Sequence, residues 1–244
     1  LIKNRELSIN CNEGVFKKND FLKLYNQKTI NHDTNNSITS DQLLRNLKKD
    51  KNNFINNVHI QLSNETHIFG NSFIQETELS TMSDNCYIKL KNQNDSTIIK
   101  GEIINIYENK QELEVIHNVI INGKDLEGSC DKMQFQSNYE NIYMQTDPVL
   151  WLNKVQVTGQ EIQLYTKNNE LDSLYIPKTP FIISPNDSLD YYNQIKGKFL
   201  SGKFKDGKMK HVNIQGNSKM KYFEHNNNSK SMMGINNIEA GNIK

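Results

Sequence analysis

The side chains that most often carry out chemistry are few and scattered in this chain. The histidines lack the His-Glu-x-x-His and His-x-His spacings of metal and general-base sites. No Gly-x-Ser-x-Gly nucleophile motif and no Gly-rich phosphate-binding loop occurs either. The six histidines are His32, His59, His67, His117, His211 and His225. We therefore expect a protein that is not an enzyme and that uses no metal and no cofactor.

The three cysteines, Cys11, Cys86 and Cys130, lie far apart in the sequence. They form no Cys-x-x-Cys pair, which excludes a zinc ribbon and a disulfide-dense scaffold. An odd number of cysteines permits one disulfide at most. We interpret all three as small buried side chains on strands.

The chain has 244 residues and a formal net charge of +1, from 29 basic and 28 acidic residues. A balanced charge creates no field that would draw the whole molecule onto nucleic acid, so we expect no nucleic-acid partner. No apolar run approaches the roughly 18 residues that span a bilayer, which predicts a soluble protein. The sequence begins at Leu1 without a signal segment, and strand-like segments resume near its end. We expect a targeting peptide to be missing and the C-terminus to be truncated.

A degenerate repeat of roughly 30 residues organises the sequence. Each copy opens with a small residue, continues as an alternating strand and a polar turn, and ends in a second strand that begins with Asn or Pro. The copies start at Cys11, Ser40, Gly70, Gly101, Gly128, Gly159 and Gly197. Because such units cannot bury their apolar faces alone, we predict one extended domain over residues 1–244.

The strands within each copy show a period of two, as where Ile104 and Ile106 flank Asn105. Polar runs rich in Asn, Asp and Gly predict hairpin loops. These loops are expected at 108–111, 137–140, 167–170 and 205–208. Pro148 and Pro180 lack a backbone N–H and fit a strand start or a bulge. The short amphipathic segment 41–48 resembles a helix, but the repeat register predicts a strand.

These hairpin units resemble the LptA/OstA family of periplasmic lipopolysaccharide-transport proteins, and in particular the OstA-like proteins of the Bacteroidetes. The resemblance is to the repeat pattern more than to sequence identity, and it covers roughly residues 9–223. Its most specific stretches run from Asp147 to Tyr165 and from Ile195 to Asn217. Where the family has Gly-Asn before the second strand, this chain has His117-Asn118, Asp147-Pro148 and Thr179-Pro180.

The resemblance implies an all-β fold: a long, twisted, antiparallel β-jellyroll, V-shaped, with two facing sheets built from repeated hairpin units. It also implies a non-enzymatic lipopolysaccharide-binding carrier in a periplasmic bridge that moves lipopolysaccharide to the outer membrane of a Gram-negative bacterium. The expected partners are lipopolysaccharide, through its lipid A acyl chains, and same-fold domains of the inner-membrane anchor and the outer-membrane translocon. Open edge strands allow head-to-tail self-association as well.

The predicted groove lining is the inward-facing apolar set of these strands. It consists of Val58, Ile60, Phe73, Ile104, Ile106, Val119, Ile121, Met133, Phe135, Val149, Trp151, Ile162, Leu164, Phe181, Ile183 and Leu200. Periodicity cannot distinguish a lined groove from a filled core. A basic cluster at Lys196, Lys198, Lys203, Lys205, Lys208 and Lys210 could meet lipid phosphates at the groove rim or form an ordinary solvated face.

Two functions of other classes remain open at this point. A structural or adhesive β-solenoid at the cell surface would bury the same residues in a closed core without a lipid ligand. A polysaccharide-binding or polysaccharide-processing protein would need exposed aromatic platforms or a carboxylate pair in a cleft, and the sequence has neither in a recognisable spacing.

Overall fold

The structure is a computed structural model. It describes residues 2–3, 7–18, 20–31, 36–91, 95–107, 110–136, 140–167, 170–186, 191–205, 208–225 and 231–244. By their contacts the residues form two compact units: unit 1 comprises 1–123 with 136–139, and unit 2 comprises 124–135 with 140–244. Whether the whole chain is one domain stays a prediction. In the described part of the chain we find no helix of the length and apolarity that a membrane span requires.

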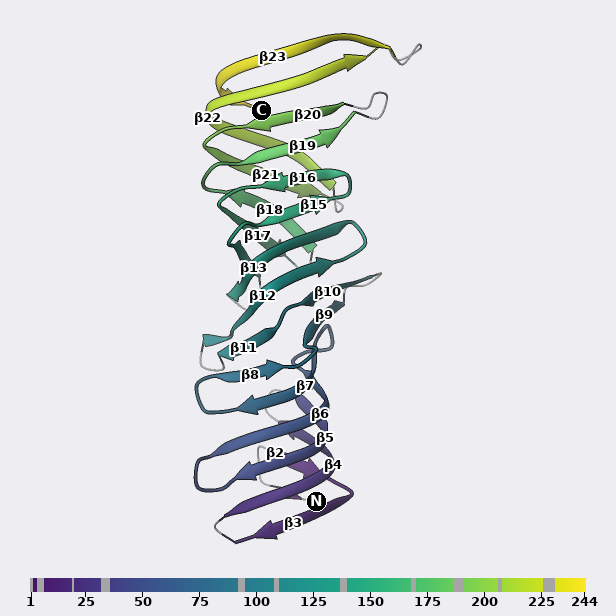
Figure 1. Ribbon diagram of the computed structural model, residues 1–244, viewed down its shortest axis with the longest axis vertical. Helices are drawn as coiled ribbons and strands as arrows, with labels where there is room; N and C mark the ends of the chain where they lie inside the picture. The colour runs from purple at the N-terminus through teal and green to yellow at the C-terminus, as the bar shows by residue number, and fades with distance from the viewer. Residues whose placement is uncertain are drawn as a thin grey trace. The chain divides into compact units, whose positions relative to one another are not determined.

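Unit 1 is built from antiparallel strands (Figure 1). They are β1 (Ile2–Lys3), β2 (Leu7–Asn10), β3 (Glu13–Lys17), β4 (Phe21–Asn31), β5 (Ser37–Asn46), β6 (Lys51–Gln61), β7 (Thr66–Gln75), β8 (Ser80–Ser83), β9 (Tyr87–Lys91), β10 (Ser96–Lys100), β11 (Ile103–Tyr107) and β12 (Glu112–Asn122). The helix-like segment 41–48 lies in β5 and the turn after it, so the strand prediction is confirmed there.

Unit 2 is also built from antiparallel strands. They are β13 (Leu126–Gln136), β14 (Asn141–Gln145), β15 (Val149–Leu152), β16 (Val155–Thr158), β17 (Glu161–Lys167), β18 (Glu170–Ile176), β19 (Phe181–Pro185), β20 (Tyr192–Lys196), β21 (Phe199–Lys205), β22 (Lys208–His225) and β23 (Met232–Ile243). The predicted all-β, antiparallel fold is therefore confirmed.

Each unit consists of two rows, where a row is a set of strands or strand segments joined side by side by backbone ladders. A long strand contributes one segment to each row. In unit 1, row A contains β1, β2, β9, β10 and segments 27–31, 37–40, 58–61, 66–70 and 119–122; row B contains β3, β8, β11 and segments 21–25, 42–46, 51–55, 72–75 and 112–116. In unit 2, row A contains β15, β16, β19, β20 and segments 126–129 and 218–225; row B contains β14, β17, β18, β21 and segment 208–215.

The chain crosses from one row to the other at bends that we call corners. At alternate corners along the chain, one or two residues adopt the left-handed backbone conformation, as Asn56 and Asn57 do with φ of 58° and 48°. At the other corners, such as Gly70–Asn71 between the two segments of β7, the small residue of a repeat lies at the bend. Between β6 and β7, Asn56 and Asn57 stand opposite a single residue, which is a β-bulge that bends the strand. The left-handed corners are at Asn26, Asn56–Asn57, Asp84–Asn85, His117–Asn118, Thr146–Asp147, Thr179 and Gly216–Asn217. Asn and Asp tolerate this conformation better than other side chains, which explains the Asn that opens the second strand of most repeats.

The small residue that opens each repeat packs against the corner of the neighbouring strand. A Cβ at Gly70 would lie 2.6 Å from the Sδ of Met82, and a Cβ at Gly101 would overlap the Cγ1 of Val115. The residue after Gly101, Glu102, donates its backbone N–H to the carbonyl of Ile116 at 3.1 Å. A larger side chain has no space here, so the repeat is a packing requirement.

One predicted repeat start needs correction. Asp131 makes the backbone contact that follows the small residue elsewhere, donating to the carbonyl of Thr146 at 3.2 Å. The small residue at this corner is therefore Cys130, which is 5% exposed, and not Gly128. The sequence pattern indicates Gly128 because this glycine lies two residues before Cys130, on the same face of the strand.

Corners are the places where the chain passes between rows, whereas each hairpin joins two strands of the same row. The rows of a unit are thus connected along one edge, and the hairpin turns lie along the opposite edge, which we call the free edge. The centres of several predicted hairpin loops, at 108–109, 137–139, 168–169 and 206–207, lie outside the described residues.

Candidate functional site

The buried side chains between the two rows include most of the predicted groove lining. Twelve of the sixteen predicted residues are no more than 7% exposed. They are Val58, Ile60, Phe73, Ile104, Ile106, Val119 and Ile121 in unit 1, and Met133, Phe135, Ile162, Leu164 and Leu200 in unit 2. Within each unit, the structure therefore buries these residues in the interior.

Four predicted lining residues do not face inward. Val149, Trp151, Phe181 and Ile183 are half-buried on the outer face. The inward positions of these strands are occupied by Leu150, Leu152 and Ile182, which are 0%, 8% and 5% exposed.

The physical reason for this correction is the backbone of proline. When the repeats of this chain are aligned with one another, Pro148 takes the place of Asn118. Proline, however, holds φ near −65° and cannot adopt the left-handed conformation. The left-handed residues at this corner are Thr146 and Asp147, with φ of 63° and 53°. Pro148 is therefore equivalent to the buried Val119, one position later than the alignment assumed. Alternation then sends every following side chain to the other face.

The interior is closely packed in this structure. The rings of Phe54 and Phe73 lie 5.6 Å apart, and Ile68, Met82 and Ile104 are 0% exposed. At the predicted lining residues the interior therefore presents no open groove. A ligand would have to separate the two rows to reach these side chains.

A line of polar side chains interrupts the apolar interior of unit 1, near the free edge of row B. Arg45, Asn52, Gln75 and Ser80 belong to the neighbouring strands β5, β6, β7 and β8, and we call them the polar strip. Each lies two residues from a buried side chain of its own strand: Leu43, Phe54, Phe73 and Met82 in turn. Because strand side chains alternate with a period of two, all four polar residues are on the inward face.

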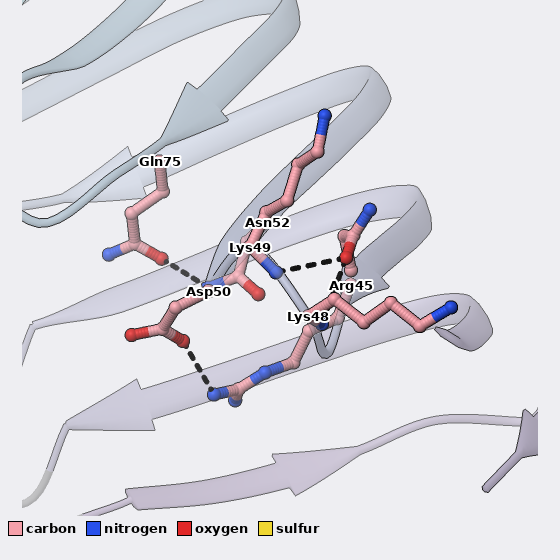
Figure 2. A network of polar contacts seen from close by, with 7 residues as sticks. Arg45, Lys48, Lys49, Asp50, Asn52 and Gln75 are labelled. Carbon is pink, nitrogen blue, oxygen red and sulfur yellow. Dashed lines mark hydrogen bonds and ion pairs between the residues drawn. The ribbon is translucent and has the colours of Figure 1, made fainter. Parts of the chain in front are cut away.

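The hydrogen bonds of the polar strip are incomplete. Figure 2 shows Asn52 donating from Nδ2 to Gln75 Oε1 at 3.0 Å, and Arg45 Nη2 pairing with Asp50 Oδ1 at 3.2 Å. Among the described residues, no protein atom pairs with the buried Nε of Arg45, the Oδ1 of Asn52 or the Oγ of Ser80. Ser80 is 0% exposed, so its hydroxyl is completely enclosed.

Sequence reasoning missed the polar strip because it looked for apolar residues at inward positions. The strip does leave a signal in the sequence. Asn52 precedes Phe54 by two, Gln75 follows Phe73 by two and Ser80 precedes Met82 by two. A polar residue in phase with the buried residues on adjacent strands is therefore the pattern that would have identified it.

Aromatic rings also stack on the outer face of row A in unit 1. Phe69 lies between His59 at 4.5 Å and Tyr87 at 4.8 Å, and His59 Nε2 lies 3.0 Å from Nδ1 of His67. Burial, and then the neighbouring His67, lower the pKa of His59. Both faces of the Phe69 ring are covered by other rings. Phe69 therefore offers no flat platform to a sugar.

The cysteines have the character of structural residues. Burial raises the pKa of both Cys86 and Cys130 to about 11, which keeps the thiols protonated and unreactive. All three cysteines are free, and Cys11 is half-buried, so the interpretation as small packed side chains is confirmed for Cys86 and Cys130. Within the described residues, no group of three or more His, Cys, Asp or Glu side chains could hold a metal ion.

Five residues of the basic cluster, Lys196, Lys198, Lys203, Lys205 and Lys210, are exposed, and the side chain of Lys208 lies outside the described residues. Lys203 pairs with Asp172 at 2.9 Å, and its hydrogen bond lowers the pKa of that carboxyl group. Lys203, Lys210 and His211 border a shallow depression of about 270 Å³ on the outer face. The cluster is thus separate from the inward-facing residues of the same strands.

No protein-family model matches the sequence, and the comparison with curated proteins finds no match. Among solved structures, the chain is similar to the crystal structure of LptH from Pseudomonas aeruginosa, described as the LptA homologous periplasmic component of the conserved lipopolysaccharide transport device. The two share 10% sequence identity with a TM-score of 0.37, over 57% of this chain and 82% of that chain.

Proposed function

We propose that this protein is a non-enzymatic carrier of lipopolysaccharide that holds the acyl chains between the two rows of a unit. The observation that carries the proposal is the connectivity: corners join the rows along one edge, and the free edge has only hairpin turns within each row. The sequence resemblance to the LptA/OstA family supports the choice of ligand.

The connectivity permits an opening motion at low cost. Among the described residues, the backbone ladders run within each row, and the chain passes from one row to the other at the corners. Separating the rows at their free edges would leave every strand ladder intact. What must be replaced is the apolar contact between inward side chains such as Ile106, Leu164 and Leu174.

An acyl chain can replace that contact. Burial of a methylene group contributes about 0.8 kcal/mol, so a chain of about ten methylenes gains roughly 8 kcal/mol. The inward side chains stay covered by hydrocarbon, so opening does not expose them to water. The sugar head would remain outside the free edge, in water.

The proposed setting is a periplasmic bridge that moves lipopolysaccharide to the outer membrane of a Gram-negative bacterium. By the sequence resemblance, its neighbours would be same-fold domains of the inner-membrane anchor and the outer-membrane translocon, with head-to-tail association of copies. At the C-terminal end, β23 pairs with β22 and has exposed apolar residues, such as Met233 at 66%, that a partner strand could cover.

The main rival is a structural protein with a permanently closed core. The described pairings are all antiparallel, whereas the coils of a β-solenoid pair in parallel. The dense packing of the interior is what favours the structural role. The two functions differ in one property: whether the interior opens to admit hydrocarbon.

Photo-crosslinking from paired positions tests the proposal. A benzophenone amino acid is placed at Leu164, which is 3% exposed, and in a control at the half-buried neighbour Tyr165 on the outer face of the same strand. A second pair uses Ile106 and the exterior Lys132. Each variant is mixed with purified lipopolysaccharide and irradiated, and its folding is checked by circular dichroism.

We expect capture of lipopolysaccharide from the inward positions and not from the outward controls. Capture from Tyr165 or Lys132 alone would contradict a carrier interior. Native mass spectrometry with and without lipopolysaccharide gives an independent readout: an adduct displaced by lipid A supports the carrier, and a bare protein under conditions that load a known carrier supports the closed core.

A further inference from the structure

We propose that the polar strip of unit 1, and Ser80 in particular, binds the polar junction where acyl chains join the head of a glycolipid. The ligand chemistry is an acyl carbonyl oxygen accompanied by a hydroxyl or amide N–H group. This inference rests on the proposed carrier function and names the contact that would orient the ligand.

The position of Ser80 matches the place of such a junction. Ser80 is the first residue of β8, after the turn at residues 76–79, and the corner of this strand is at Asp84–Asn85. The next inward residue toward the corner is Met82, which is 0% exposed. An acyl chain entering at the free edge would lie against Met82, and its carbonyl group would remain beside Ser80.

The hydrogen bonding of Ser80 differs from that of other interior serines. Ser40 donates to the carbonyl of Gln42 at 2.8 Å, and Ser218 donates to the carbonyl of Ile214 at 3.0 Å. Ser80 has no such protein partner among the described residues, although it is 0% exposed. A buried hydroxyl without a partner destabilises the folded state, and a ligand that supplies the partner would remove that cost.

The neighbouring strip residues offer complementary groups. Arg45 has a buried Nε–H donor, and Asn52 has a buried Oδ1 acceptor, both without a protein partner in the described part of the chain. Ser80 can donate and accept. The strip thus offers donors to carbonyl oxygens and an acceptor to a hydroxyl or an amide N–H, the groups present where a hydroxylated or amide-linked acyl chain meets a sugar.

Two commercial glycolipid probes compare an ester linkage with a glycosidic linkage that lacks a carbonyl group. Sucrose monolaurate and dodecyl maltoside have a disaccharide head and a chain of the same length, but only the first has an ester carbonyl. Their binding to the intact chain is measured by displacement of a fluorescent fatty acid, below the concentrations at which they form micelles. The variants are Ser80→Ala and, as controls, Ser40→Ala and Ser218→Ala.

We expect the unsubstituted protein to bind the ester probe about five-fold more tightly than the glycoside probe, the size of effect that one hydrogen bond produces. Ser80→Ala should remove this preference by weakening the ester alone, without lowering the thermal midpoint. Ser40→Ala and Ser218→Ala should lower the thermal midpoint, since each loses an internal hydrogen bond, and should retain the preference.

The other outcomes overturn the proposal in distinguishable ways. If both probes bind but neither is preferred, or if Ser80→Ala retains the ester preference, the polar strip does not bind the carbonyl group. The carrier function stands in that case. If Ser80→Ala lowers the thermal midpoint as much as Ser218→Ala does, the hydroxyl has an internal role. If neither probe nor lipopolysaccharide binds, the carrier function fails and the strip's role fails with it.

Discussion

The two units share one topology but differ in the inward layer of row B nearest the free edge. In unit 1 this layer contains the half-buried Asn52 and Gln75 together with Ser80. In unit 2 the neighbouring positions on β14, β17 and β18 are Ile142, Leu164 and Leu174, which are 8%, 3% and 1% exposed. On β6, β7 and β8, unit 1 therefore has polar side chains where unit 2 has apolar ones, whereas the adjoining Ile106 and Leu113 of unit 1 are apolar.

This difference shows which positions the fold constrains. The corners are alike in both units, because each left-handed corner of one strand packs beside a small residue of the neighbouring strand. The free-edge layer is under no such requirement, and its side chains can vary from leucine to arginine. Variation there changes what the interior can bind while leaving the backbone unchanged.

Placing a polar side chain in the apolar layer of unit 2, and an apolar one in the polar layer of unit 1, should give the largest difference in the free energy of unfolding. Leu174→Gln in unit 2 removes a packed side chain and buries an amide in an apolar layer, and we expect a loss of about 3 to 5 kcal/mol in the free energy of unfolding. The reciprocal change in unit 1, Gln75→Leu, loses one hydrogen bond to Asn52 but adds apolar contact, and should cost less than about 1 kcal/mol. Chemical denaturation measures both. Equal costs would show that the two layers are not different environments.

The corners should respond alike in both units. Gly101→Ala in unit 1 and Gly159→Ala in unit 2 place a methyl group against Val115 and Ile176, which are both 0% exposed. We expect each to lower the free energy of unfolding by about 1 to 3 kcal/mol through overpacking. Gly241→Ala in β23 is the control, because nothing lies within 4 Å of its Cβ position. A corner variant as stable as this control would contradict the packing role of the small residues.

A change of pH should have a smaller effect on thermal stability, through the titration of His59 in unit 1. Because burial lowers the pKa of His59, the unfolded chain binds this proton more tightly than the folded chain. Stability from this group is therefore present above the unfolded pKa of about 6.5 and is lost as the pH falls below it. The thermal midpoint should fall between about pH 7.5 and about pH 5.5, and His59→Phe should reduce that fall. An identical pH profile in the variant would exclude His59 as the cause.

The smallest effect is expected at exposed ion pairs, one in each unit. Lys17 pairs with Asp20 at 2.7 Å in unit 1, and Lys203 pairs with Asp172 at 2.9 Å in unit 2. Water and salt screen such pairs. Asp20→Asn and Asp172→Asn should therefore leave the thermal midpoint almost unchanged at high salt. A large drop for Asp172→Asn would mean that the basic cluster depends on this carboxylate.

Most of the fold followed from local sequence rules. Alternation predicted the strands, the Asn-rich positions marked the corners, and the small residues marked their packing partners. Those rules work because left-handed backbone and steric exclusion act within a few residues. The prediction erred at Val149 and Phe181, where proline occupies the position after the corner and a shift of one residue reverses the face of a strand.

What the sequence by itself determined is therefore the element type, the bends and most of the buried residues. Only the tertiary structure decided which polar side chains share a face, because Arg45, Asn52 and Ser80 lie on different strands and come together through pairing. It also decided that corners join the rows along one edge. Both properties depend on register between strands, which no single strand encodes, and both underlie the proposed opening and the proposed contact with the ligand.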